Sequence, residues 1–449
     1  MENFFNRIQA FDKRSAIIYN DLTFNYSDLA RQIQAYSDYL AGKVAVGEIV
    51  FLYSSYNFFS IALFLALIKN KNIVVPVVPD FSNKEIEKKR SKLKPNKIIS
   101  LDNQKIIFEN CNIDGKRKNQ IKLLQKKDHP GLILFSSGTT GEPKIILHDL
   151  DELISSYSSN KIKDINSLLF LAFDHIGGID TLFRLLSIGG TLTIPEDSNA
   201  ENICRLIEKH RVNVLPASPT FLNLILIGEL HEKYDLSSLK IIGYGAESMP
   251  EYVLQRLNNV FPGVDIQQKF GTSETNAVKI LSRSAKSTDF KIIDPNVDYK
   301  IIDGELWLKS KNQIKEYLNF ASDNFTPDGW FKTGDIVEKF SDGYIRIKGR
   351  KKEVINVGGE KVLPLEVENI LLEIPEIKEC IVYPEDNPIT GQMVVADVIL
   401  NKILTKAEIK NIIRNYCKDK LRKFKIPVKV NIVEQILHGK RIKKKRLDH

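Results

Sequence analysis

Short β-branched runs alternate with longer helical patterns through the first 80 residues of the chain. Helical patterns cover residues 26–40 and 58–68, and β-branched runs cover 49–53 and 72–78. This alternation favours a parallel sheet, because each parallel crossover needs a long return segment that is usually a helix. The pattern therefore predicts an α/β protein whose sheet is covered by helices.

The alternation resumes at 132–135, after a lysine-rich stretch at 83–127 that has a weaker pattern and is expected to lie mostly at the surface. Further along, the segments 304–310 and 343–350 alternate between apolar and polar residues, which predicts antiparallel strands. From residue 351 the order strand, helix, strand, strand, helix predicts a compact α+β unit of about 100 residues. The chain is therefore expected to hold more than one domain.

Composition and local patterns exclude several classes of protein. The 449 residues are 43% hydrophobic and 27% charged, as in globular proteins. The longest apolar run, 58–68, is shorter than the roughly 18 residues needed to span a bilayer, so we expect a buried helix and no membrane span. Residues 1–12 lack the apolar centre of a signal peptide, so a cytoplasmic protein is expected. No CxxC spacing indicates a disulfide framework or a zinc cluster among Cys111, Cys204, Cys380 and Cys417.

Positive charge is concentrated near the C-terminus. Residues 402–449 hold 16 lysines and arginines against 4 acidic residues, a net charge of +12, so the rest of the chain carries −3 of the total of +9. Such a segment suits a nucleic acid, a polyanionic small molecule such as a nucleotide or coenzyme A, or plain solvated surface. No zinc-finger pattern or RNA-recognition signature accompanies it, so no nucleic-acid partner is expected.

The strongest local pattern is SSGTTGEPK at residues 136–144. An apolar run leads into glycines and hydroxyl residues, whose flexible backbone N–H groups and side chains suit phosphate oxygens. Lys144 adds a positive charge. The segment is not a Walker motif, because Pro143 precedes the lysine where that motif has glycine. The alternative is an ordinary turn at the end of a strand.

Two further segments present a carboxylate beside hydroxyl residues. In KFGTSET at 269–275, Glu274 is suited to hold Mg²⁺ through one oxygen, although it could equally cap the next helix. In DGWFKTGDI at 328–336, Asp335 is suited to accept hydrogen bonds from both hydroxyls of a ribose, as acidic residues do in dinucleotide folds. The alternative for Asp335 is the carboxylate of an Asx turn.

The last two segments are less specific when taken alone. The region 343–368 contains glycines at 349, 358 and 359, which mark backbone that turns tightly or approaches a ligand closely. The sequence HGKRIKKKRL at 438–447 is a basic stretch of the kind that is often solvated surface.

In this order, the five segments resemble the adenylate-forming, or AMP-binding, family of acyl- and aryl-CoA synthetases, luciferases and peptide-synthetase adenylation domains. The resemblance extends from Leu22 to Gly439–Lys440. It implies a large multi-subdomain N-terminal domain at 1–350 and a mobile C-terminal lid at 351–449, with a hinge near Lys352. It implies activation of a carboxylic acid by ATP and Mg²⁺ to acyl-AMP, release of pyrophosphate, and transfer of the acyl group to a thiol.

The resemblance also implies roles for individual residues. Glu274 would bind Mg²⁺, Ser273 would assist at the α-phosphate, and Lys440 would reach the carboxylate and the α-phosphate during adenylation. The other implied contacts are Ser136, Ser137, Gly138, Thr139, Thr140, Gly141 and Lys144 for the β- and γ-phosphates, Gly245, Ala246, Glu247, Phe270 and Gly271 around the adenine, Asp335 and Arg350 at the ribose, and Gly359 in a pantetheine tunnel.

The acid and the thiol acceptor remain open at this point. His175 aligns with a histidine that borders the acyl pocket in many acyl- and aryl-CoA ligases. Asp174 falls where amino-acid-activating domains bind the substrate ammonium. The sequences HIGG and YGAE favour the first interpretation, a CoA ligase for an acyl or aryl acid. The alternative is an enzyme that loads an amino acid or acyl group onto the phosphopantetheine of a carrier protein.

The chain departs from the family pattern at several places, one of which is Lys443, where an arginine is usual. The family usually has Pro-Arg-Thr before the final Gly-Lys pair, whereas residues 434–438 are EQILH. The segment 276–304, which usually helps to shape the acyl pocket, is abbreviated. A nucleotide-binding sensor without turnover is disfavoured by the retention of Glu274, Asp335, Arg350 and Lys440.

Overall fold

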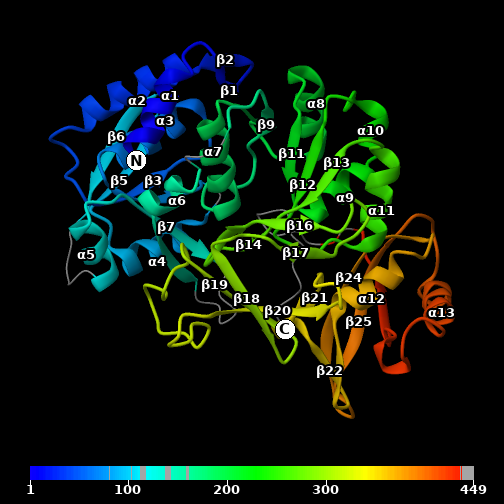
Figure 1. Ribbon diagram of the computed structural model, residues 1–449. Coiled ribbons are helices and arrows are strands. Elements are labelled where there is room, and N and C mark those ends of the chain that lie inside the picture. The colour runs from blue at the N-terminus through cyan, green and yellow to red at the C-terminus, as the bar shows by residue number, and fades with distance from the viewer. Residues whose placement is uncertain are drawn as a thin grey trace.

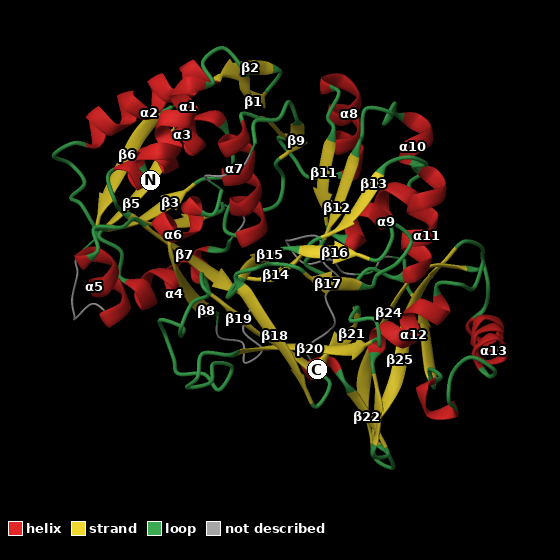
Figure 2. Cartoon of the chain, viewed as in Figure 1, coloured by secondary structure: helices red, strands yellow, loops and turns green. Residues whose placement is uncertain are grey.

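The computed structural model describes residues 1–79, 81–102, 104–111, 118–136, 143–157, 161–434 and 436. Figure 1 shows two α/β units side by side, an antiparallel sheet beneath them, and the C-terminal residues to one side of that sheet. Figure 2 shows helices against both parallel sheets. The predicted α/β class, with several helix-covered sheets and a small C-terminal α+β unit, is confirmed.

The first parallel sheet has the strand order β6-β5-β3-β4-β7-β8. Its central strands are parallel, and β6 and β8 are antiparallel edges. Helices α4 (Asn83–Leu93) and α5 (Asn119–Lys126) cover one face. The strands are β3 (Ile49–Tyr53), β4 (Ile73–Val77), β5 (Lys97–Asp102), β6 (Lys105–Asn110), β7 (Gly131–Ser136) and β8 (Lys144–Asp149).

The stretch 83–127 therefore contributes more than surface. Its strand β5 pairs with β3 in the middle of the sheet, and Ile99 is fully buried. Most of the other described residues of the stretch are exposed or half-buried, so the expectation that it lies mostly at the surface is confirmed, with Ile99 as an exception. Lys97 at the start of β5 is half-buried, whereas Lys89 on α4 is 5% exposed.

The second parallel sheet has the order β13-β12-β11-β9-β10-β1-β2, and only the β1–β2 pair is antiparallel. Helices α8 (Ala200–His210), α9 (Pro219–Ile227), α10 (Leu230–Lys233) and α11 (Glu251–Val260) cover its outer face. The strands are β1 (Ser15–Tyr19), β2 (Leu22–Asn25), β9 (Asn166–Leu168), β10 (Thr191–Ile194), β11 (Val214–Ala217), β12 (Ile241–Tyr244) and β13 (Asp265–Gln268).

Five helices fill the space between the two parallel sheets, where one hydrophobic cluster joins side chains from both. Residues 60–68 of α3 are all buried, as expected for a helix that is apolar on every side. The predicted buried helix is thus confirmed. None of the described helices has the length and apolarity needed to cross a membrane. The five are α1 (Glu2–Ala10), α2 (Tyr26–Leu40), α3 (Phe58–Lys69), α6 (Leu150–Ser155) and α7 (Ile176–Ile188).

The third sheet is antiparallel, with the order β16-β17-β21-β20-β19-β18, and a short hairpin of β14 and β15 precedes it. The two strands predicted at 304–310 and 343–350 are both present, but they are not neighbours. Strand β20 lies between them and pairs antiparallel with each. The strands are β14 (Phe270–Thr272), β15 (Asn276–Val278), β16 (Ile280–Ser282), β17 (Phe290–Ile292), β18 (Val297–Ile302), β19 (Glu305–Ser310), β20 (Phe331–Lys339) and β21 (Ile345–Arg350).

The C-terminal unit follows a 3₁₀ turn, η1 (Lys351–Glu353), and contacts the rest of the chain through α12. The backbone N–H of Glu251 donates to Oδ1 of Asn369 at 3.3 Å. The domain boundary at 350 and the hinge at Lys352 stay predictions. The elements are β22 (Ile355–Val357), β23 (Glu360–Val362), α12 (Pro364–Leu371), β24 (Ile377–Asn387), β25 (Gly391–Leu400), α13 (Lys406–Cys417), η2 (Lys423–Lys425) and β26 (Lys429–Ile432).

Candidate functional site

A cavity of about 2770 Å³ lies where the carboxyl ends of strands from both parallel sheets meet the antiparallel sheet. Ser136 lies in the cavity wall at the carboxyl end of β7, and Gly245 lies there directly after the carboxyl end of β12. Ligands of open α/β sheets bind at carboxyl ends of this kind. The candidate residues that line the cavity are Ser136, Lys144, Asp174, His175, Gly245, Ala246, Glu247, Phe270, Gly271, Ser273, Glu274, Asp335, Arg350 and Lys352.

Lys144, Tyr317 and Glu274 form one hydrogen-bonded cluster in this cavity. The ammonium of Lys144 donates to the hydroxyl of Tyr317 at 2.9 Å, and that hydroxyl donates to Oε1 of Glu274 at 2.7 Å. The lysine nitrogen lies 3.8 Å from the same carboxylate oxygen. Burial lowers the pKa of Lys144, with the Glu274 carboxylate opposing and the nearby charges of Lys352 and Arg350 adding to the decrease.

The sequence analysis missed Tyr317. Its side chain is 2% exposed, and burial followed by the Glu274 carboxylate raises its pKa, so the phenol keeps its proton and donates. It stands in KNQIKEYLNF, where no hydroxyl or glycine pattern marks a site.

The phosphate-binding candidates are only partly described. Ser136 and Lys144 pair across the antiparallel strands β7 and β8, so the two ends of the glycine-rich segment lie side by side. Ser137, Gly138, Thr139, Thr140 and Gly141 lie outside the described residues. Lys440 also lies outside them, so its predicted role stays a prediction.

His148 of β8 lies near the backbone of Ser273, and its imidazole is 3% exposed. Its Nε2 has no hydrogen-bond partner among the described residues. Burial lowers the pKa of His148 to about 4, with the nearby Ser273 backbone opposing the decrease. The ring is therefore neutral near pH 7.

Asp335 and Arg350 occupy paired positions on β20 and β21. Nε of Arg350 lies 2.9 Å from Oδ1 of Asp335, and its Nη1 donates to the backbone oxygen of Thr333 at 2.9 Å. The Asp335 side chain is 4% exposed. Burial raises the pKa of Asp335 to about 6, although the Arg350 charge and the Thr333 hydroxyl oppose the increase. A buried carboxylate held this way is a strong hydrogen-bond acceptor for a ligand hydroxyl.

The segment predicted to surround the adenine turns sharply after β12. A Cβ atom on Gly245 would lie 2.8 Å from the backbone oxygen of Lys269, so only glycine fits there. Ala246 follows with a φ of +69°, in the left-handed region. The Glu247 carboxylate accepts from the Thr220 hydroxyl at 2.7 Å, which holds the turn against the start of α9.

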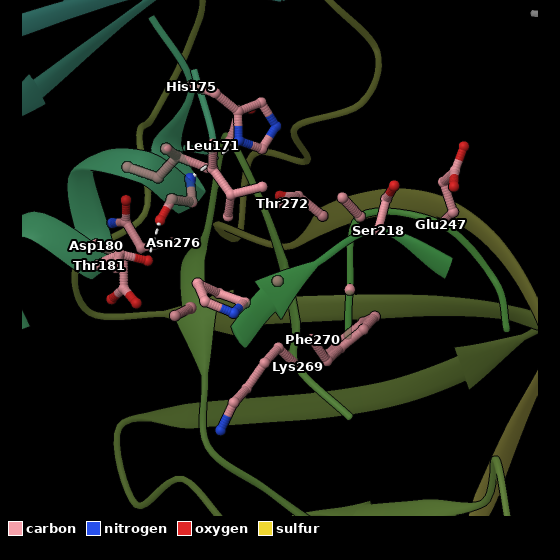
Figure 3. Close-up of a pocket in the computed structure, with 18 of the residues that line it drawn as sticks. Leu171, His175, Asp180, Thr181, Ser218, Glu247, Lys269, Phe270, Thr272 and Asn276 are labelled. Carbon is pink, nitrogen blue, oxygen red and sulfur yellow. Dashed lines mark hydrogen bonds between the residues drawn. The ribbon is translucent and has the colours of Figure 1, made fainter. Parts of the chain in front are cut away.

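Phe270 and Gly271 form the opposite wall of this region. The Phe270 ring is 9% exposed and lies 5.1 Å from the Phe290 ring. Gly271 has a φ of +154°, and a Cβ atom there would lie 2.2 Å from the backbone oxygen of Asn276. Figure 3 shows Glu247 on one side of the pocket, Asp180 on the opposite side and Thr272 between them.

His175 and Asp174 lie at the start of α7 on the other side of the pocket. Nδ1 of His175 accepts from the backbone N–H of Gly177 at 3.0 Å and caps the helix. Asp174 is 3% exposed. Burial raises the pKa of Tyr56, and the negative charge of Asp174 raises it further. The structure thus places both substrate candidates at the cavity, with the aspartate facing a phenol.

Gly359 lies in the turn between β22 and β23, with a φ of +89° and open space around it. It does not line the cavity in this arrangement of the chain. Its predicted place in a pantetheine tunnel refers to a second lid orientation and stays a prediction.

Comparisons with known proteins support the resemblance. The model of the AMP-binding enzyme family matches residues 4–318, and that of the AMP-binding enzyme C-terminal domain matches residues 366–444. The chain is 27% identical to 4-coumarate–CoA ligase-like 9 of Arabidopsis thaliana over 351 residues. This alignment covers 72% of the chain and 62% of that relative, so the match spans less than two thirds of the relative's length.

Solved structures show the same fold over nearly the whole chain. The anthranilate CoA ligase AuaEII in complex with anthranoyl-AMP has a TM-score of 0.83 at 18% identity, with 99% of this chain and 95% of that chain covered. The O-succinylbenzoate coenzyme A synthetase of Bacillus subtilis in complex with ATP and magnesium has a TM-score of 0.77 at 22% identity, covering 97% and 96%. Since the AMP-binding enzyme model matches more than half of the residues, the chain belongs to the AMP-binding enzyme family.

Proposed function

We propose that the protein activates a carboxylic acid with ATP and Mg²⁺ as an acyl-AMP and then transfers the acyl group to the thiol of coenzyme A. The observation that carries the proposal is the convergence of Lys144, Glu274 and the buried Asp335–Arg350 pair on one cavity. A cation, a carboxylate that can take Mg²⁺ and a ribose-type acceptor are what a nucleoside triphosphate requires. The names of the relatives as CoA ligases support the choice of acceptor.

In the first half-reaction, a carboxylate oxygen of the acid attacks the α-phosphorus of ATP, and the bond to the bridging oxygen of pyrophosphate breaks. Both reactants are anions, so the residues must supply positive charge and hold the two groups in line. Lys144, beside the glycine-rich segment, is placed to hold the departing phosphates. Ser273, which lines the cavity next to Glu274, would assist at the α-phosphate.

The residues around Glu274 fit Mg²⁺. This ion prefers oxygen ligands and keeps several waters, so one carboxylate in the cavity wall suits it together with nucleotide phosphates. When bound, it neutralises phosphate charge and polarises the reacting phosphoryl group. Within the part of the chain that the structure describes, no group of three or more His, Cys, Asp or Glu side chains forms a complete metal site. The nucleotide would therefore complete the coordination.

In the second half-reaction, the thiolate attacks the acyl carbon and AMP leaves with the bonding electron pair of the acyl–oxygen bond. Asp335 and Arg350 hold the ribose throughout. We include in the proposal that residues 351–449 rotate about Lys352 between the two steps, which would carry Gly359 toward the thiol. Transfer to a carrier-protein phosphopantetheine is the alternative acceptor, and a cytoplasmic location remains part of the proposal.

Acid-dependent exchange of labelled pyrophosphate into ATP tests the first half-reaction. The panel contains fatty, aromatic, dicarboxylic and amino acids, and each active acid is then offered coenzyme A and a holo carrier protein. We expect exchange with at least one acid class and thioester formation with coenzyme A. Folded protein that binds ATP but gives no exchange with any acid would overturn the enzymatic proposal, and acylation of the carrier alone would overturn the choice of acceptor.

A further inference from the structure

The acid side of the cavity lies between α7 and the inner face of the second parallel sheet. This wall includes apolar side chains from β11, from β12 and from the segment directly after β9, such as Val214, Ile241 and Leu169. On α7 it presents Asp180 and Arg184. The long cationic side chain of Lys269 also lines the cavity, next to Phe270 (Figure 3).

Lys269 stands between β13 and β14, directly before Phe270. Its backbone is fixed by a hydrogen bond of 2.7 Å from its N–H to the backbone oxygen of Tyr244. Its stem passes over Gly243, because a Cβ atom built on Gly243 would lie 3.4 Å from Cε and 3.7 Å from Cγ of the lysine. The absence of a side chain at Gly243 therefore makes room for the lysine inside the cavity.

The charge of Lys269 is not matched by a direct carboxylate partner. Its ammonium donates to Oε1 of Gln267 at 2.6 Å, and no ion pair of Lys269 occurs among the described residues. The Gln267 amide also donates to the carboxylate of Asp265. Burial lowers the pKa of Lys269, with the charge of Arg184 adding to the decrease and the carboxylates of Asp180 and Asp265 opposing it. The lysine side chain is exposed to the cavity, so a ligand that enters displaces water from the ammonium, and an anionic group on that ligand replaces the lost interaction.

Arg184 differs from Lys269 because the chain already neutralises it. Its Nη2 lies 2.8 Å from Oδ2 and 3.0 Å from Oδ1 of Asp180, and Asp180 also accepts from the Tyr157 hydroxyl at 2.6 Å. This network fixes Arg184 on the helix. Arg184 therefore contributes a positive edge to the cavity, whereas Lys269 retains an ammonium that a ligand can pair with.

The reacting carboxylate must lie near Ser273 and Glu274, and this limits the distance to Lys269. Ser273 is four positions after Lys269, and four extended steps of chain span at most about 14 Å. A ligand group that meets Lys269 therefore belongs to the same small acid molecule whose carboxylate reacts.

We propose that the acid carries a second carboxylate, and that Lys269 pairs with it and selects dicarboxylic over monocarboxylic substrates. This inference rests on the proposed function, because it names the substrate class of the same site. A monocarboxylic acid with an apolar tail would leave the ammonium desolvated and unpaired, which is unfavourable. The second carboxylate replaces the water that the ammonium loses.

The experiment compares pairs of acids with the same carbon skeleton and one or two carboxylates, such as butyrate with succinate, valerate with glutarate, and 3-methylbenzoate with isophthalate. The readout is kcat and KM for acid-dependent ATP–pyrophosphate exchange. Wild-type protein is expected to prefer the dicarboxylic member of at least one pair by 100-fold or more in kcat/KM. The variants are Lys269→Met, Lys269→Arg and, as a control, Lys240→Met, because Lys240 is exposed outside the cavity.

We expect Lys269→Met to lose most of the preference through a higher KM for the diacid, with exchange on the matched monoacid unchanged or improved. Lys269→Arg should retain most of the preference, and Lys240→Met should behave as wild type. A wild-type preference for the monoacid in every pair would overturn the inference, as would an equal loss on both acids in Lys269→Met. Exchange with no acid at all would instead overturn the proposed function.

Discussion

The hydroxyl of Tyr317 donates a hydrogen bond of 2.7 Å to Oε1 of Glu274, across 43 residues of sequence. The same hydroxyl accepts from Lys144, so a neutral phenol separates a cation from an anion that are both largely buried. Pairing of this kind offsets the cost of burying either charge. It also holds the carboxylate in one orientation before any ligand arrives, which is what an electrostatic catalyst requires.

The first prediction concerns Tyr317→Phe, which removes this hydroxyl and keeps the buried ring. A hydrogen bond to a charged group contributes about 1.5–3 kcal/mol. The rate of ATP–pyrophosphate exchange should therefore fall roughly 10- to 100-fold, with a weaker apparent affinity for Mg²⁺. Tyr39→Phe is the control, because Tyr39 is an exposed tyrosine away from the cavity. Unchanged exchange and Mg²⁺ dependence in Tyr317→Phe would show that the hydroxyl does not position Glu274.

The second prediction concerns Glu274→Gln, which keeps the shape of the side chain and removes its charge. An amide oxygen still accepts from Tyr317, so the fold should be retained, whereas the ion loses its anionic ligand. We expect exchange at fixed Mg²⁺ to fall at least 100-fold and a titration with Mg²⁺ to recover only part of it. Thermal unfolding of the variant checks the fold. Wild-type Mg²⁺ dependence would place the ion elsewhere.

The third prediction concerns the protonation of Asp335, whose pKa burial raises to about 6 from an ordinary value of 3.8. The folded state binds this proton more tightly than the unfolded state does. Its contribution to stability is therefore fully present below pH 3.8 and is lost as the pH rises through about 6. The unfolding free energy of wild type, relative to the non-titrating Asp335→Asn, should fall by about 3 kcal/mol between pH 3.5 and pH 7.

Protonation of the Asp335 carboxylate should also weaken the binding of ATP at low pH. The charged form of Asp335 accepts hydrogen bonds from ribose hydroxyls, so KM for ATP should rise as the pH falls below about 6, by up to tenfold per unit. Asp335→Asn should have a high KM with no such pH dependence. Urea unfolding and exchange kinetics over the same pH series check both effects. Parallel curves for wild type and variant would contradict the assigned pKa.

The sequence predicted those parts of the fold that local periodicity encodes. The helices α2 and α3 and the strands β3 and β4 follow their apolar patterns because each is set by short-range spacing. Strand β5 was hidden, since flanking lysines reach solvent while Ile99 packs inward. Local patterns also could not predict that β20 lies between β19 and β21, because strand order depends on the path of the whole chain.

The candidate site was predictable where glycines and carboxylates cluster in sequence, and not where distant segments meet. Glu274 and Lys144 were named separately, but nothing in the sequence indicated that they are 3.8 Å apart. Tyr317 had no pattern at all around it. Lys269 was the first residue of a recognised segment, yet its value as a cavity cation depends on Gly243, a residue of the neighbouring strand. Such pairings arise only from tertiary structure.

The last prediction concerns Lys440→Met, which tests the proposed division of labour between the core and the lid. At an effective dielectric constant of about 20, one positive charge at about 4 Å from the reacting anions lowers the barrier to their reaction by about 4 kcal/mol. Its loss should slow acyl-AMP formation roughly 1000-fold. Thioester formation from chemically prepared acyl-AMP should stay near the wild-type rate, because the lid has rotated by that step. Lys443→Met is the matched control, since it removes one charge from the same basic segment. Equal losses in both half-reactions, or an equal effect of Lys443→Met, would mean that Lys440 contributes general positive charge and is not delivered to the α-phosphate.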